Sequence, residues 1–230
     1  MSLTAPLRRP LERIETSLSR PTGPLGIAIG HAMSLQHYTL TAWCHRLLDP
    51  PAGASVLDIG CGSGNALRLL GRRCSGRLAG VDPSSTMVEM TRRANRSADR
   101  QDRLTVQQGS ALDLPCADDS FDVVTAIETL YFWPDPRRGL REALRVLRPG
   151  GRLAVALEMT RDAAEVPTLL QRVFGAKFTQ RSAGAGLSIV SGAELAEMVG
   201  DTGFDRIRFA VEPRRSLGWL CVLARKPDRC

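Results

Sequence analysis

The sequence lacks the long apolar runs that export or membrane insertion would require. No segment reaches the roughly 18 consecutive apolar residues of a membrane-spanning helix. Arg8-Arg9 is superficially like a twin-arginine signal, but residues 10–15 after it contain no uninterrupted apolar stretch. We therefore expect a soluble protein that is neither exported nor inserted into a membrane.

Paired cysteine motifs are also absent. None of the six cysteines forms a C-x-x-C pair, and three of them fall in apolar or glycine-rich segments rather than in a loop framework. A disulfide scaffold is therefore not expected. A reducing, cytoplasmic location fits this pattern best.

Lysine is scarce, although the formal net charge is +7. Lysine occupies only two of the 31 basic positions, Lys177 and Lys226, so the others are arginine. Basic surfaces attract polyanions, yet the arginines are scattered and form no run of five or more. The sequence favours a solvated arginine-rich surface over a nucleic-acid partner.

The length and composition are those of one ordinary domain. The chain has 230 residues, of which 43% are hydrophobic and 24% charged, as in typical globular proteins. Prolines disfavour a helix within residues 1–25 and indicate an arm. Apolar residues recur at helical intervals over residues 27–48, which predicts one or two helices before the break at residues 50–53.

Short apolar runs then alternate with longer amphipathic segments. The expected strands are 55–59, 77–81, 104–107, 121–127 and 152–157, and the expected helices are 65–74, 85–98 and 137–147. Ser84 is the expected N-cap of the second of these helices. Because each strand is followed by a helix or a crossover, the pattern is typical of a parallel sheet flanked by helices.

The last third of the chain differs. It contains expected helices at 163–173 and 192–199, a glycine-rich loop at 183–186, and expected strands at 206–211 and 219–223. The link between these two strands is too short for a parallel return, so they should form an antiparallel hairpin. The predicted fold class is α/β, with a seven-stranded, mostly parallel sheet, a C-terminal antiparallel hairpin and helices on both faces.

A glycine loop follows the first expected strand. Gly60, Gly62 and Gly64 allow a sharp turn and let a ligand lie against backbone. A dinucleotide fingerprint would need glycine or alanine at Asn65, and Asp58 would repel a pyrophosphate. S-adenosylmethionine (SAM) is cationic, so Asp58 can bind it directly or through water; alternatively, Asp58 caps the loop or the helix.

A second acid closes the second expected strand. Asp82 stands 20 residues after Gly62, where a carboxylate can accept both ribose hydroxyls of an adenosine cofactor. The alternative is that Asp82-Pro83-Ser84 forms a turn and a helix cap. Met87 could pack on adenine, although methionine at this spacing is more often part of a core.

Five motifs in order resemble those of the class I SAM-dependent methyltransferases, particularly the small-molecule group that includes the ubiquinone and menaquinone methylases. The resemblance covers residues 55–155, and its motifs are VLDIGCGSG at 56–64, GVDPS at 80–84, GSALDLP at 109–115, DDSFDVV at 118–124 and LRPGGRL at 147–153. It implies a Rossmann-like, doubly wound fold, SAM as cofactor and S-adenosylhomocysteine as product.

The resemblance also implies a domain plan and a cofactor site. Residues 1–50 should form an N-terminal arm and a helical lid, residues 51–230 the SAM-binding domain, and residues 158–190 a variable cover over the substrate. Many relatives have aspartate where this chain has Ser110, a weaker acceptor for the adenine amino group. The expected cofactor-binding residues are Tyr38, Asp58, Gly60, Cys61, Gly62, Gly64, Asp82, Pro83, Met87, Ser110, Ala111 and Ile127.

The substrate side gives fewer signals. Glu128 and Tyr131 follow the fourth expected strand, at the edge where open α/β sheets bind ligands, and His37 lies in the expected lid; these three are the candidate catalytic residues. The aromatic residues after Glu128 could line the acceptor pocket, or could pack on a helix that Asp135-Pro136 caps. The histidines lack a recognisable carboxylate or cysteine cluster, so no metal is expected.

The expected activity is transfer of a methyl group from SAM to an O, N or C atom of a small molecule. Three alternatives remain open at this point: an NAD(P)-type Rossmann oxidoreductase, a SAM-binding protein without turnover, and a nucleic-acid methyltransferase. The sequence does not identify the acceptor or the oligomeric state.

Overall fold

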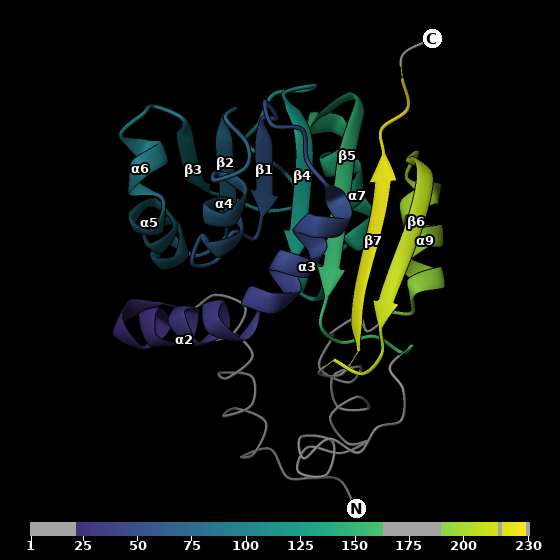
Figure 1. Ribbon diagram of the computed structural model, residues 1–230, viewed down its shortest axis with the longest axis horizontal. Helices are drawn as coiled ribbons and strands as arrows, with labels where there is room; N and C mark the ends of the chain where they lie inside the picture. Colours follow the sequence, from purple (N-terminus) through teal and green to yellow (C-terminus); the bar gives the residue numbers. More distant parts are fainter. Residues whose placement is uncertain (1–21, 163–189, 216–217, 229–230) are drawn as a thin grey trace, which may run out of the picture.

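A twisted seven-stranded sheet forms the centre of the molecule in the computed structural model, which describes residues 22–162, 190–215 and 218–228 (Figure 1). The strand order is β3-β2-β1-β4-β5-β7-β6. Only β7 runs antiparallel to its neighbours, β5 and β6. The strands are β1 (Val56–Ile59), β2 (Leu78–Asp82), β3 (Leu104–Gln108), β4 (Phe121–Ile127), β5 (Leu147–Leu157), β6 (Asp205–Glu212) and β7 (Trp219–Arg225). The predicted α/β class, the mostly parallel sheet and the C-terminal hairpin are confirmed.

Helices cover both faces of the sheet, as predicted. Side chains alternate along β1: Leu57 and Ile59 join the core under α7 and α9, whereas Val56 joins the core under α3, α4 and α5. The helices are α2 (Gly23–Gln36), α3 (Tyr38–Leu48), α4 (Asn65–Leu70), α5 (Ser85–Ala94), α6 (Arg96–Asp99), α7 (Pro136–Val146) and α9 (Gly192–Asp201), with a short 3-10 turn, η2 (Leu130–Phe132). No helix among the described residues combines the length and apolarity needed to span a bilayer.

Two of the predicted N-caps have the expected hydrogen bonds. Ser84 accepts from the Met87 N–H at the start of α5. Asp135 accepts from the Arg138 N–H, and Pro136 occupies the first turn of α7. The capping role considered for Asp135-Pro136 is therefore confirmed.

Several predicted boundaries are wrong. β5 begins at Leu147 rather than at residue 152, because Leu147 pairs with Phe121 of β4 and the backbone of Gly150 and Gly151 bonds to Lys226. The helix predicted at 85–98 ends early, at Ala94. There the Asn95 side chain donates to the carbonyl oxygens of Thr91 and Gly64 and so ties the helix end to the glycine loop.

The N-terminal helices begin at the carboxyl edge of the parallel strands and continue over one face of the sheet. Figure 1 shows α2 along this edge and α3 crossing the face of β4 and β5. An added Cβ at Gly30 would approach Met87 and Met90 to 3.0 Å, so the absence of a side chain there lets α2 lie against α5. The predicted helix at 163–173 and the glycine-rich loop at 183–186 lie outside the described residues.

Candidate functional site

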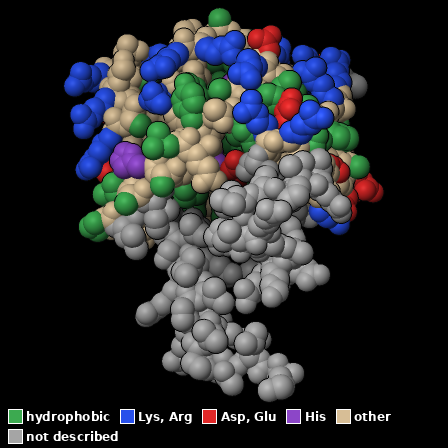
Figure 2. Space-filling model, turned by 60° about the horizontal axis from the view of Figure 1, so that its bottom comes forward, with side chains coloured by type: hydrophobic (Ala, Val, Ile, Leu, Met, Phe, Trp, Pro, Cys, Tyr) green, Lys and Arg blue, Asp and Glu red, His purple; other side chains and the backbone are tan. Residues whose placement is uncertain are grey.

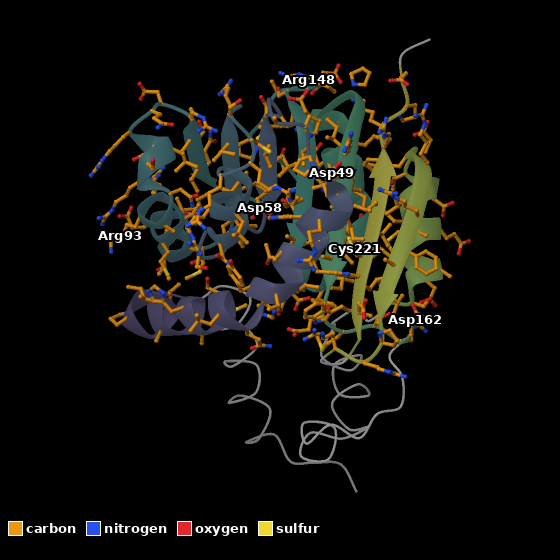
Figure 3. All side chains as sticks on the ribbon, in the orientation of Figure 1. Asp49, Asp58, Arg93, Arg148, Asp162 and Cys221 are labelled. Carbon is orange, nitrogen blue, oxygen red and sulfur yellow. The ribbon has the colours of Figure 1, made fainter. Side chains whose placement is uncertain are left out.

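A cavity of about 370 Å³ opens at the carboxyl ends of β1, β2 and β4, beneath α2 and the start of α3. Asp58, which Figure 3 labels at the end of β1, lies in its wall. Most of the residues expected at the site line this cavity. They are His37, Asp58, Gly60, Cys61, Gly62, Asp82, Pro83, Met87, Ser110, Ala111, Ile127 and Glu128.

Three expected site residues do not line the cavity. Tyr38 begins α3 with 42% of its surface exposed. Gly64 is the N-cap of α4 and faces Thr91 of α5 and Asn95, the C-cap of that helix. Tyr131 is buried behind Glu128.

The glycine loop adopts the left-handed backbone that its sequence indicated. Gly60, Gly62 and Gly64 have φ angles of 72°, 52° and 81°. A Cβ at Gly60 would lie 2.2 Å from Thr129 Oγ1, and one at Gly64 would lie 2.7 Å from Asn95 Nδ2. The loop therefore requires glycine at Gly60 and Gly64 for both conformation and space.

Asp82 fixes this loop from the end of β2. One carboxylate oxygen accepts from the Gly62 N–H at 2.9 Å and the other accepts from the Ser84 N–H at 2.8 Å. Burial raises the pKa of Asp82, and these two hydrogen bonds oppose the rise. The turn-forming role considered for Asp82 is therefore present together with its place in the cavity wall.

Asp58 is the second buried acid in the wall. It is 2% exposed and accepts from Thr125 Oγ1 at 2.6 Å. Burial raises the pKa of Asp58 to about 7, the hydrogen bond from Thr125 opposes this, and the nearby Asp82 adds to it. No lysine or arginine is among the residues that line the cavity in the described part of the chain. This wall suits a cationic ligand and disfavours a pyrophosphate.

Ser110, Ala111 and Leu112 also line the cavity, on the same side as the glycine loop. Ser110 Oγ accepts from the Leu112 N–H at 3.1 Å, so part of its acceptor capacity is already used. We name the residues from Asp58 to Gly64 together with Asp82, Met87 and residues 110–112 the glycine-loop half.

Glu128 lies on the side of the cavity opposite the glycine-loop half, immediately after β4. Its backbone is left-handed, with φ at 57°, which is strained for a residue with a side chain. Its carboxylate accepts from the Glu158 N–H and lies 3.2 Å from the Tyr131 hydroxyl. Burial raises the pKa of Glu128 to about 7, although the charge of His37 opposes the rise.

His37 lies at the junction of α2 and α3 and faces two carboxylates. Its Nδ1 is 2.8 Å from Glu158 Oε2 and 3.8 Å from Glu128 Oε2. Burial works against charging the ring, but Glu158 and Glu128 outweigh it, so the pKa of His37 is raised above 6.5. We name His37, Glu128 and Glu158 the imidazole cluster.

The expectation that the histidines lack carboxylate partners is wrong for His37. In the imidazole cluster, one nitrogen and two carboxylate oxygens lie within 4.8 Å of one another, a donor set that a divalent cation accepts. Glu158 was not predicted from the sequence, although the strand register could have indicated it. Ala156 pairs with Ile127, which places the residues following β5 and β4 at the same edge.

Helix and loop residues complete the wall near the imidazole cluster. Trp133 Nε1 donates to Thr129 Oγ1 at 3.2 Å, and the Trp133 ring covers Gly139 of α7. Trp133 therefore both packs on the helix and borders the cavity, so the two roles considered for it coexist. The lining residues that the sequence analysis did not select include Gly30, Met33, Ser34, Thr41, Leu112, Thr129, Phe132 and Pro134.

A doubly wound sheet of this order is typical of nucleoside-binding proteins, and its acidic glycine loop suits a ligand with positive charge. The family described as "Methyltransferase domain" matches residues 57–155. The chain is 35% identical over 176 residues to methyltransferase GfsG of Streptomyces halstedii, covering 71% of this chain and 63% of that protein. It is 32% identical over 170 residues to O-methyltransferase rstn1 of Aspergillus nomiae, covering 74% of this chain and 72% of that protein.

Solved structures agree with these relatives. The methyltransferase solved in complex with the Haloferax volcanii Trm112 activator superposes with a TM-score of 0.70 at 25% identity, covering 86% of this chain and 93% of that one. The chain belongs to the class I SAM-dependent methyltransferases, a family whose cofactor is SAM. It spans about three fifths of the length of the first curated relatives it matches.

Proposed function

We propose that this protein transfers a methyl group from SAM to a hydroxyl oxygen of a small organic molecule and releases S-adenosylhomocysteine. The observation that carries the proposal is the imidazole cluster at the cavity wall, because an alcohol or a phenol must lose a proton as its oxygen is methylated. Relatives named O-methyltransferases support oxygen as the acceptor atom. A 27-O-demethylrifamycin SV methyltransferase from Amycolatopsis mediterranei is 41% identical over 109 residues.

The glycine-loop half is the proposed cofactor site. Asp82 would accept from ribose hydroxyls, Asp58 would neutralise the ligand's positive charge, and Met87, Ser110 and Ala111 would border adenine; all five line the cavity. Ile127 and Cys61 complete this wall, whereas Tyr38 and Gly64 would contribute only through the segments they begin. When bound, SAM supplies an activated methyl group on a sulfonium centre.

His37 is the proposed proton acceptor. In its neutral form it would take the hydroxyl proton of the acceptor, and Glu158 and Glu128 would stabilise the resulting imidazolium. Tyr131 is a positioning residue, because its hydroxyl contacts Glu128 and accepts from the Met159 N–H at 2.9 Å. Catalysis then depends on alignment of the acceptor oxygen and on exclusion of water.

Two other functions fit the site less well. A dinucleotide-dependent oxidoreductase would have to place a pyrophosphate beside the buried Asp58 and Asp82. A nucleic-acid methyltransferase would be expected to carry lysine or arginine at the cavity, and neither is among the described residues that line it. We also propose a cytoplasmic location, which rests only on the spacing of the cysteines in the sequence.

The test is a turnover assay with SAM labelled in its methyl group and a panel of phenols and aliphatic alcohols. The wild-type protein should form a labelled methyl ether with at least one acceptor. His37→Ala should lower kcat by about 100-fold or more and keep the SAM affinity, because only the proton acceptor is removed. The matched control is His31→Ala, since His31 lies exposed on α2 outside the cavity lining.

Two results would contradict the proposal. A protein that binds SAM but labels no acceptor, including amines and carbon nucleophiles, would be a binding protein without turnover. If His37→Ala and His31→Ala had equal kcat values, the proton acceptor would lie elsewhere.

A further inference from the structure

A second cavity, of about 280 Å³, lies far from the glycine loop and is lined by four arginines. Arg152 comes from β5, Arg206 and Arg208 from β6, and Arg225 from β7. Arg206 lies near the start of β6 and Arg225 at the end of β7, at the edge of the sheet opposite the carboxyl ends of β1, β2 and β4. We name this feature the arginine cavity.

The arginines of this cavity are poorly neutralised. The described residues give these four side chains a single ion pair, between Arg206 and Asp228 at 3.9 Å, and both partners are well exposed. Asp205 pairs in register with Arg225 but is not among the lining residues. Some arginines elsewhere on the surface, such as Arg93 with Glu89 and Arg145 with Glu142, have carboxylates at 2.8 Å or less. Figure 2 shows other Lys and Arg side chains spread over the surface, whereas the four arginines described here line a single cavity.

The strand geometry brings like charges together. Arg152 and Arg225 are direct partners across β5 and β7, an arrangement that destabilises a sheet unless something offsets the repulsion. The pairing of β6 with β7 shifts register between Asp205 and Arg208, and Arg206 has a left-handed φ of 48°. Irregularities of this kind redirect side chains and often occur at functional sites.

Part of this charge supports α3. Arg152 donates to the carbonyl oxygens of Leu48 and Asp49, and Arg208 donates to that of Leu47 at 3.3 Å. Arginines near a helix C-terminus satisfy its last carbonyl groups. This role uses only some of the five N–H donors of each guanidinium, and it does not involve Arg206 or Arg225.

We infer that the arginine cavity is a binding site for a phosphate-bearing anion. A tetrahedral phosphate offers several oxygens to converging guanidinium groups, which bind such oxygens in pairs. Two linked phosphates would match the excess of positive charge better than one. The site is separate from the cofactor cavity and shares no lining residue with it.

Calorimetric titration of the full chain with inorganic diphosphate tests this inference, with orthophosphate and citrate as comparison ligands. We expect saturable binding of one diphosphate per chain, with orthophosphate weaker. The Arg206→Gln/Arg225→Gln variant should bind diphosphate at least 10-fold more weakly while keeping its melting temperature and its SAM affinity. Asp228→Asn should bind diphosphate at least as tightly as wild type, because a competing carboxylate is removed.

The matched control is Arg93→Gln, which removes an exposed arginine on α5. In Figure 3, Arg93 lies at the opposite end of the sheet from β6 and β7. It should bind diphosphate like the wild type. Three results would overturn the inference: no saturable binding of diphosphate, equal weakening in Arg93→Gln, or citrate binding as tight as that of diphosphate. None of them bears on methyl transfer, which the labelled-SAM assay tests separately.

Discussion

The glycine-loop half and the imidazole cluster border one cavity but are assembled in different ways. The glycine-loop half consists of short segments at the ends of β1, β2 and β3, and the backbone N–H groups of Gly62 and Ser84 fix the carboxylate of Asp82. The imidazole cluster joins His37, Glu128 and Glu158, which come from a helix junction and the ends of two strands. The first depends on local conformation and the second on tertiary placement.

This difference predicts that the two regions can be damaged separately. Changes in the glycine-loop half should alter cofactor binding, whereas changes in the imidazole cluster should alter turnover with the cofactor still bound. The variants below test that separation from the largest expected effect to the smallest.

Asp82→Asn should weaken SAM binding by about 100-fold, as expected when buried charge-assisted hydrogen bonds are lost. The amide can present only one acceptor oxygen, so either the Gly62 or the Ser84 N–H loses its partner. Isothermal calorimetry measures the change, with Asp99→Asn as the control because Asp99 is exposed on α6. An unchanged SAM affinity would remove Asp82 from the cofactor site.

Glu158→Gln should lower kcat by about 10-fold and leave the SAM affinity within a factor of three. It should also move the rise of kcat with pH to lower values. Glu158 raises the pKa of His37, so His37 in the variant should lose its proton at lower pH and become a competent base there. A pH profile of kcat checks this shift, which loss of packing alone would not produce.

Treatment with a chelator distinguishes proton transfer from metal catalysis. If the imidazole cluster acts through protons, extensive treatment with EDTA should leave kcat unchanged. Loss of turnover with EDTA and its recovery with Mg²⁺ or Zn²⁺ would instead make His37, Glu128 and Glu158 metal ligands.

Gly60→Ala should destabilise the protein by about 1–3 kcal/mol, because the added Cβ meets Thr129 and the backbone stays left-handed. Thr129 follows Glu128 in the chain, so this variant should also disturb the contact between the glycine-loop half and the imidazole cluster. Denaturant unfolding measures the loss. Gly53→Ala is the matched control, since no heavy atom lies within 4 Å of its added Cβ; equal losses would refute the steric account.

For the protein without SAM, Asp58→Asn should have the smallest effect, a change in how stability depends on pH. Because burial raises the pKa of Asp58 from 3.8 to about 7, the folded protein retains a proton that the unfolded chain releases. Stability therefore falls as pH rises from 3.8 to about 7. The variant should melt a few degrees above wild type at pH 8 and show little difference at pH 4, with Asp99→Asn as control.

The sequence predicted the glycine-loop half well because its determinants are local. The apolar run of β1, the glycines at 60, 62 and 64, and Asp82 at the end of β2 define strand, turn and acid within 27 residues. Parallel pairing of β1 with β2 then brings these segments together. For this reason, most of the residues that were predicted to bind the cofactor are found in the cavity lining.

Prediction failed where distant segments decide the outcome. Residues 148–151 contain proline and glycines typical of a turn, yet Leu147 and Arg152 on either side pair with β4, and Gly150 and Gly151 bond to Lys226, so the segment stays in a strand. Glu158 was not selected because nothing within the segment marks it. Its proximity to His37 follows from the register of β4 with β5 and from the position of α2 across the sheet edge.

A calorimetric titration with SAM, S-adenosylhomocysteine and NADH tests the central claim most directly. The acidic wall formed by Asp58 and Asp82 predicts saturable 1:1 binding of SAM and S-adenosylhomocysteine and no binding of NADH. Binding of NADH in the absence of any SAM binding would contradict the account.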